Sequence, residues 1–219
     1  MTADSGVALL SAAGSEQLVD TAAVNGGAIG GDDRGEFGGA IWWTGPDGRR
    51  DTLRVEGRNS TVFAADNLHG LMRRRGELYA LVGVHHLVLD EGELLHLSQD
   101  SAARWHVRHL MTLNGAPRAY TLVGIDSALV VAGDSLIALK FDSIAPTRRT
   151  LYGNPTWVYT YASSLLRDRA GTVYMGMRSA VSRLTPRAGG YHEDWLVPER
   201  CRRRVPVGYL EPCRCESGD

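Results

Sequence analysis

A pattern that recurs three times along the chain constrains its fold more than any other feature. Each copy has a short apolar run, a central glycine, a second apolar run and a tryptophan about twenty residues further on. The glycine and tryptophan pairs are Gly83 with Trp105, Gly133 with Trp157, and Gly176 with Trp195. A looser copy surrounds Gly39, with Phe63 at the position of the tryptophan. Self-similarity at about 40–50 residues predicts a repeat architecture built from small β-sheets.

Turn residues separate the apolar runs at intervals of about ten beyond residue 40, which predicts strands joined by hairpins. Gly45–Gly48 (GPDG) predicts a turn, because proline presets φ and glycine accepts a positive one. Asp90–Glu93 (DEGE) predicts a second turn, which would place His86 opposite Leu97. Glycine weakens a strand unless another backbone comes close. We therefore expect the central glycines where sheets converge, and the trailing tryptophans as large fillers between sheets.

The third copy of the repeat is the sharpest. It contains Asp168–Gly176 (DRAGTVYMG), followed by Val181, Arg183, Leu184 and Pro186. This stretch resembles the repeat of the bacterial two-component-regulator-type propellers, from which it departs at Met177 and Ala180, where Thr and Gly are usual. The resemblance covers about 140 residues, weakly outside 168–186. It implies a propeller-like fold and does not imply a sensor kinase.

We therefore predict an all-β fold, a small β-propeller of four or five blades, with an open curved β-sheet or sandwich as the alternative. Residues 1–219 are expected to form a single propeller-like domain, with a Gly-rich N-terminal segment at 1–35 and an Arg/Cys-rich tail at 198–219. A strand from Leu18–Val24 or Gly27–Gly31 is expected to close the propeller by pairing with a blade from the other terminus.

Composition narrows the class of partner. The net charge of −1 argues against a nucleic-acid binder, which usually carries a basic excess. No run approaches ~18 apolar residues, so we expect no membrane span. The first residues lack the charged and apolar regions of a secretory signal. We expect a cytoplasmic protein, or a periplasmic one if Met1 replaces a removed signal.

All three cysteines lie near the C-terminus, at Cys201, Cys213 and Cys215. An odd number excludes complete intramolecular pairing. Free thiols and one disulfide from Cys201 to either of the others both remain open. A zinc site would need a fourth ligand from elsewhere.

Histidines are concentrated between residues 85 and 109, among several acidic residues. The hairpin predicted above puts His85 and His96 on one face, and His106 could complete a metal site with them. We favour the competing interpretation of local hydrogen bonding or solvent exposure, because no compact ligand spacing such as H-E-x-x-H occurs. We expect no cofactor.

Motifs for a catalytic nucleophile are absent: the chain has neither G-x-S-x-G nor G-x-x-x-x-G-K-[ST]. The adjacent acids Asp32–Asp33 and Glu193–Asp194 are interpreted as solvated loop charge and not as carboxylates held across a cleft. From the residues alone we therefore expect no enzyme.

Basic clusters and a tryptophan pair suit the binding of a protein partner with an acidic surface. The candidate residues are Trp42, Trp43, Arg73, Arg74, Arg75, Arg202, Arg203 and Arg204. Trp42 and Trp43 must point to opposite sides of their strand. The sequence predicts a non-catalytic protein-binding module, most concretely a bacterial inhibitor or immunity protein that neutralises a toxin. The alternatives are a small-ligand or metal-dependent enzyme that uses the axial funnel of the propeller, and a fragment of a larger sensor propeller.

Overall fold

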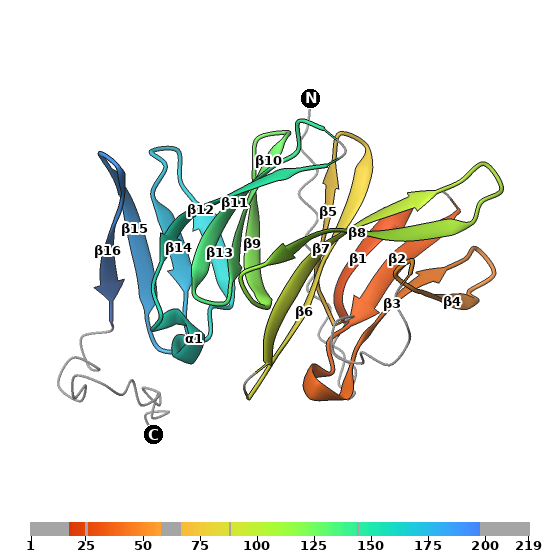
Figure 1. The fold of residues 1–219 in the computed structure, drawn as a ribbon, viewed down its shortest axis with the longest axis horizontal. Coiled ribbons are helices and arrows are strands. Elements are labelled where there is room, and N and C mark those ends of the chain that lie inside the picture. Colours follow the sequence, from red (N-terminus) through yellow and green to blue (C-terminus); the bar gives the residue numbers. More distant parts are fainter. Residues whose placement is uncertain (1–17, 25, 58–66, 88, 144, 198–219) are drawn as a thin grey trace, which may run out of the picture.

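The computed structural model describes residues 18–24, 26–57, 67–87, 89–143 and 145–197. Four antiparallel sheets of four strands each make up nearly all of this part of the chain. Figure 1 shows the sheets in a row, with β16 at one end and β4 at the other. The fold is therefore all-β and propeller-like with four blades, named A to D in chain order, as predicted. Within the described ranges, no helix is long and apolar enough to cross a membrane.

The blades follow one another along the chain. Blade A contains β1 (Leu18–Val24), β2 (Gly27–Asp32), β3 (Ala40–Thr44) and β4 (Arg50–Leu53). Blade B contains β5 (Leu68–Arg74), β6 (Glu77–His86), β7 (Leu89–Gln99) and β8 (Trp105–Leu113). Blade C contains β9 (Pro117–Val123), β10 (Ser127–Ala132), β11 (Ser135–Lys140) and β12 (Thr147–Gly153). Blade D contains β13 (Ser164–Arg167), β14 (Val173–Gly176), β15 (Val181–Arg187) and β16 (Gly190–Leu196). Two short helices lie between strands, η1 (Gly35–Phe37) and α1 (Trp157–Thr160).

The first strand of each blade is the innermost one. Strands are paired in chain order within every sheet, and β5 packs beside β1 on one side and beside β9 on the other. Strand β9 in turn packs beside β13. Side chains on β5 and β9 are therefore brought together at the centre of the molecule.

Apolar side chains fill the space between successive blades in three clusters. Between blades A and B, Ile41 and Leu95 are buried, and Trp105 packs against this cluster. Between blades C and D, Trp157 is 1% exposed, and Trp195 packs against the same cluster. The prediction that the trailing tryptophans fill gaps between blades is confirmed.

Two of the central glycines lie where blades B and C converge. A Cβ on Gly83 would lie 2.8 Å from Cδ of Pro117 and 3.1 Å from Cα of Ala116, both at the start of blade C. Gly133 has a φ of +57°, and a Cβ there would lie 2.6 Å from the carbonyl oxygen of Asn114. Another backbone thus comes too close at these two positions for any side chain, which is the reason expected for the glycines.

The first blade begins earlier than the repeat pattern predicts. Leu18–Val24 and the Gly27–Gly31 stretch pair with each other as β1 and β2, so the prediction that one of them closes the propeller is wrong. Gly39 directly precedes β3 and is not the central glycine of a second strand. A Gly-rich strand carries too little apolar pattern to reveal its register. Phe63 lies outside the described residues.

The predicted turn at Asp90–Glu93 is also wrong, whereas Gly45–Gly48 forms the turn between β3 and β4. Residues Asp90 to Glu93 lie within β7, and the chain reverses near Leu87, whose φ is +52°. Gly92 pairs with Gly83 in the strand, and a side chain there would strike the carbonyl oxygen of Gly115. This glycine serves a close approach of the backbone and not a turn.

Candidate functional site

Charged and aromatic side chains from every blade region meet at one end of the inner strands. We call this group the axial cluster; it consists of Asp33, His69, His85, Asp90, Arg118 and Tyr161. Asp33 follows β2, His69 lies on β5, and His85 and Asp90 flank the turn between β6 and β7. Arg118 lies on β9, and Tyr161 follows α1 in the connection to blade D.

Arg118 is the central cation of the axial cluster. Its guanidinium lies 5.4 Å from the centroid of the Tyr161 ring. Burial lowers the pKa of Arg118, and the neighbouring Asp90, Tyr161 and Asp33 oppose that shift. The group stays charged at neutral pH because the ordinary pKa of arginine is above 12. Its Nε and Nη2 atoms are buried and have no hydrogen-bond partner in the described part of the chain.

A histidine and a carboxylate face each other beside this arginine. Nδ1 of His85 lies 3.3 Å from Oδ1 of Asp90, and the same oxygen accepts a hydrogen bond of 2.8 Å from the backbone N–H of Ala116. The His85 ring meets Tyr161 edge-on, with centroids 6.4 Å apart. The two groups do not have the geometry of a hydrogen bond, so Nδ1 of His85 is a buried nitrogen without a hydrogen-bond partner among the described residues.

The second histidine of the cluster has an acceptor at each ring nitrogen. Nε2 of His69 lies 3.1 Å from the carbonyl oxygen of Gly83, and Nδ1 lies 3.5 Å from Oδ2 of Asp33. Only the protonated ring can donate to both acceptors. Burial nevertheless lowers the pKa of His69, while the charge of Asp33 acts in the opposite direction. His69 is thus a neutral ring, and each of its two nitrogens has an acceptor to which it could donate if the ring were protonated.

Exposed apolar side chains lie at the same end of the blades as the axial cluster. Phe37 on η1 is 81% exposed, Leu87 in the β6–β7 turn is 85% exposed, and Tyr159 on α1 is 80% exposed. In Figure 1, the β6–β7 turn and α1 lie along the same lower edge of the molecule. This edge therefore combines a charged centre with an apolar rim.

The three histidines considered as metal ligands are not brought together. His85 belongs to the axial cluster, whereas His96 lies beside the Tyr79 ring with its Nε2 atom 2.7 Å from Oε2 of Glu77. Within the described residues, no group of three His, Cys, Asp or Glu side chains could hold a metal ion. The reason is the length of β6 and β7, which pair His85 with Asp90 and His96 with Tyr79, far apart along the ladder.

His106 joins blades A and B at the surface. Its Nδ1 atom lies 2.7 Å from Oε1 of Glu56, and its Nε2 atom lies 3.2 Å from Oδ2 of Asp100. These two hydrogen bonds, the one to Glu56 first, raise the pKa of His106. The backbone N–H of Arg104 and the side chain of His106 lower the pKa of Asp100.

The basic cluster at Arg73–Arg75 does not form a joint surface. Arg73 donates to the carbonyl oxygens of Ala23 at 2.8 Å and Gly76 at 3.4 Å, so it ties blade B to blade A. Arg74 is 7% exposed and donates to the carbonyl oxygen of Arg73, while Arg75 lies 4.0 Å from Asp126. The three side chains thus have separate neighbours.

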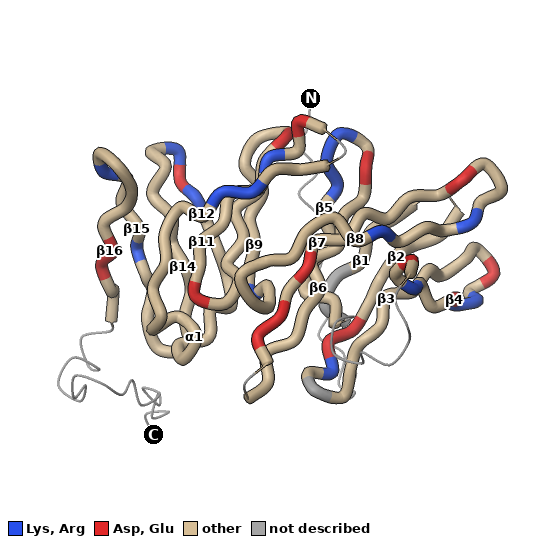
Figure 2. Tube along the Cα trace, viewed as in Figure 1, with Lys and Arg blue, Asp and Glu red and all other residues tan. Residues whose placement is uncertain are grey.

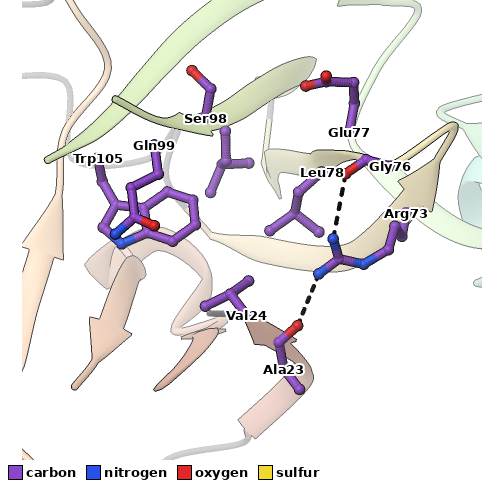
Figure 3. Close-up of a pocket in the computed structure, with 10 residues that line it drawn as sticks. Ala23, Val24, Arg73, Gly76, Glu77, Leu78, Ser98, Gln99 and Trp105 are labelled. Atoms are coloured by element: carbon purple, nitrogen blue, oxygen red, sulfur yellow. Dashed lines mark hydrogen bonds between the residues drawn. The ribbon is translucent and has the colours of Figure 1, made fainter. Parts of the chain in front are cut away.

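A pocket of about 550 Å³ lies beside Arg73, between blades A and B. Figure 3 shows Trp105 and Gln99 on one side of it and Arg73 on the other. Because the guanidinium of Arg73 is engaged by two carbonyl oxygens, this pocket offers a ligand less charge than the axial cluster does.

The tryptophan pair is placed as its spacing predicts. Trp43 packs against the apolar cluster between blades A and B, and Trp42 lies on the opposite face, 4.9 Å below the guanidinium of Arg50. A partner-binding role for either tryptophan stays a prediction. Cys201, Cys213, Cys215, Arg202, Arg203 and Arg204 lie outside the described residues, so the predictions on the tail also stay open.

Most of the axial cluster has no signal in the sequence. Asp33 was interpreted as solvated loop charge, but it faces His69. His69 and Arg118 stand alone between apolar residues of strands in different blades. Only His85 was singled out, and then as a metal ligand.

The comparisons with known proteins were made on sequence and on structure. No protein-family model matches the chain, and no curated protein matches it significantly. A gluconolactonase from Xanthomonas campestris has a similar fold, with a TM-score of 0.47 and 15% identity over 78% of this chain and 59% of its own. A streptogramin B lyase has a TM-score of 0.47 and 14% identity over 80% of this chain and 53% of its own. The extracellular domain of a proposed one-component system from B. thetaiotaomicron has a TM-score of 0.45 and 10% identity over 84% of this chain and 30% of its own.

The chain is a β-propeller-like repeat protein. It spans less than two thirds of the length of each of these three chains. The expectation of a non-catalytic inhibitor or immunity protein is wrong by this comparison, because the similar folds include two enzymes. At these identities the likeness concerns the fold alone, and the activities remain those of the other proteins.

Proposed function

We propose that the axial cluster binds a small anionic substrate and catalyses a general acid–base reaction on it. The observation that carries this proposal is the half-buried side chain of Arg118, whose buried Nε and Nη2 atoms have no hydrogen-bond partner in the described structure. Buried donors are nearly always hydrogen-bonded, and the neighbouring Asp90 and Asp33 offset the charge of Arg118 without accepting from these two atoms. A carboxylate or phosphate group of a ligand supplies the missing acceptors.

His85 is the group that exchanges a proton with the bound substrate. Oδ1 of Asp90 lies 3.3 Å from Nδ1 of the His85 ring without forming a hydrogen bond, so this buried nitrogen is left to exchange a proton with a ligand. Tyr161 contacts both Arg118 and His85, so it places the anchored anion beside the acid–base group. The apolar rim at Phe37 and Tyr159 favours a substrate whose remaining part is apolar.

The pH dependence of binding follows from His69. Its pKa is lowered by burial, so the ring is neutral at neutral pH and gains a charge only as the pH falls. A cation added beside Arg118 attracts an anion more strongly. We therefore expect the affinity of an anionic ligand to increase as the pH falls below the ordinary histidine pKa of about 6.5, and expect His69→Gln to abolish this increase.

Binding is tested by calorimetry with acetate, succinate and inorganic phosphate as probes. Arg118→Gln should weaken binding by about tenfold or more, since a charge-assisted hydrogen bond contributes about 1.5–3 kcal/mol. Arg183→Gln is the control, because Arg183 lies on blade D and pairs with Asp194 at the surface. If Arg118→Gln binds these probes as tightly as the parent protein does, the proposal is wrong.

Catalysis is tested by following proton release over a panel of small carboxylate and phosphate esters. His85→Gln should lower turnover by about 10²-fold or more and leave probe binding within about threefold. Binding that depends on Arg118 without turnover of any ester would favour the second candidate, a ligand-binding sensor propeller. The identity of a protein partner and the expected cytoplasmic location stay predictions.

A further inference from the structure

A second charged cleft lies between blades C and D, at the opposite end of the blades from the axial cluster. Its volume is about 430 Å³, which lies in the range of pockets for small ligands. It is formed where β9 and β13 end and where β10 and β12 begin. Figure 2 shows basic residues along β12. We call it the C/D cleft and define it by Lys140, Arg149, Leu151, Arg167 and Tyr191.

Strand register shows which side chains face this cleft. Arg149 pairs with Ala138, and Ala138 packs against the apolar cluster between blades C and D, so Arg149 lies on that face of blade C. Lys140 lies two residues after Ala138 and therefore shares the face. Arg148 also belongs to the lining of the cleft, but its guanidinium points to blade B, where it donates to the backbone oxygen of Thr112.

Blade D supplies the opposing wall. Arg167 pairs with Val173, which is fully buried in the C/D cluster, so Arg167 lies on the face toward blade C. Tyr191 pairs with Pro186 and packs against the same cluster. Basic side chains of two blades thus meet over a wall formed by Tyr191 and Leu151.

The two arginines lack partners of their own. Among the residues that the structure describes, neither Arg149 nor Arg167 makes a hydrogen bond or ion pair. Lys140 is partly compensated, because its Nζ atom lies 3.4 Å from Oδ2 of Asp142. Two exposed guanidinium groups that line one cleft create a positive potential there that attracts an anion. Each guanidinium also presents the planar donor fork that matches a phosphate or sulfate.

We propose that the C/D cleft binds a small phosphate or sulfate ester that carries an aromatic or apolar group. The anionic headgroup lies between Arg149 and Arg167, and the apolar group lies against Tyr191 and Leu151. The site is separate from the axial cluster and does not depend on its function.

Phenyl phosphate, phenyl sulfate and inorganic phosphate are the probes, measured by calorimetry at fixed ionic strength with the full chain. We expect phenyl phosphate to bind more tightly than inorganic phosphate, since only the former can contact Tyr191. Arg149→Gln and Arg167→Gln should each weaken its binding by about tenfold. The two substitutions concern exposed side chains, so melting curves should confirm that both variants fold. Comparison of the two phenyl esters shows which headgroup the cleft prefers.

Arg148→Gln is the matched control, because it removes the neighbouring charge from the opposite face of β12. It should change the affinity for phenyl phosphate less than twofold, and Arg118→Gln should leave binding at the C/D cleft unchanged. Equal weakening by Arg148→Gln and Arg149→Gln would show attraction to net charge only and overturn the proposal. Loss of all phenyl phosphate binding in Arg118→Gln would overturn it as well, by placing that ligand in the axial cluster.

Discussion

The carboxylate of Glu193 on β16 is the polar contact between blades C and D that we expect to matter most for stability. Its Oε1 atom accepts hydrogen bonds from Trp157 Nε1 at 2.8 Å and Ser182 Oγ at 2.6 Å. Its Oε2 atom accepts from Asn154 Nδ2 at 2.5 Å and Tyr152 OH at 3.3 Å. Trp157 is 1% exposed and Ser182 is 0% exposed, so these donors cannot turn to water instead.

Glu193→Gln keeps the shape of the side chain and replaces one acceptor oxygen with an NH₂ group that can only donate. Whichever way the amide turns, one obligate donor, Nε1 of Trp157 or Nδ2 of Asn154, then faces another donor, whereas the hydroxyl on the same side can turn to accept. A hydrogen bond to a charged acceptor contributes about 1.5–3 kcal/mol, and a buried unpaired donor costs about 1–3 kcal/mol. Since one of the two oxygens keeps its bonds, we expect the free energy of unfolding to fall by about 3 kcal/mol. For a chain of this size that lowers Tm by about 6–12 °C.

Urea unfolding followed by tryptophan fluorescence measures this change. Asp194→Asn is the matched control, because Asp194 is the next residue on β16 and forms a surface ion pair with Arg183 at 2.9 Å. We expect the control to change the free energy of unfolding by less than about 1 kcal/mol. If Glu193→Gln has no larger effect than Asp194→Asn, the reasoning that this network joins the two blades is refuted.

Three further predictions concern other parts of the fold. Gly70→Ala places a Cβ within the ring of Tyr120, so it should destabilise the protein by about 2 kcal/mol in urea unfolding; an unchanged midpoint would contradict the packing of β5 on β9. The folded-state pKa of His106 is raised, so its stabilising charge is present below the unfolded-state pKa of about 6.5 and is lost as the pH rises through the folded-state value. Tm between pH 5 and 9 should show this decline in the parent protein and not in His106→Gln. Trp43→Ala should cost about 3 kcal/mol because it removes a ring that packs against the cluster between blades A and B, and Trp42→Ala less than half of that; equal costs would show that both rings contribute to the core.

Local pattern alone determined much of the fold. Apolar runs around Gly83 and Gly133, at a spacing that matches one sheet, indicated blades before any contact was known. Trp157 is buried between two blades as its place after Gly133 predicts. These features are visible in the sequence because each blade is a local unit whose alternation and turns depend on neighbours along the chain.

Two errors arose where a residue serves a contact with a distant strand. Gly92 looks like a turn residue in Asp90–Glu93, yet it stays in β7 because the backbone at Gly115 passes against it. Glu193 looks like solvated charge, yet its neighbours on two blades provide four donors. No local pattern carries either contact, because the partners come from other strands.

Only the tertiary structure decided which side chains form the axial cluster. His69 and Arg118 belong to different blades and meet because β5 and β9 are innermost strands that pack side by side. Asp33 and Tyr161 join them from connections that lead out of β2 and into β13. By itself the sequence determined repeats, strands and interblade tryptophans, since these depend on alternation along the chain. Blade packing decided the site, since a single polar residue on an inner strand has no periodicity that reveals its neighbours across the axis.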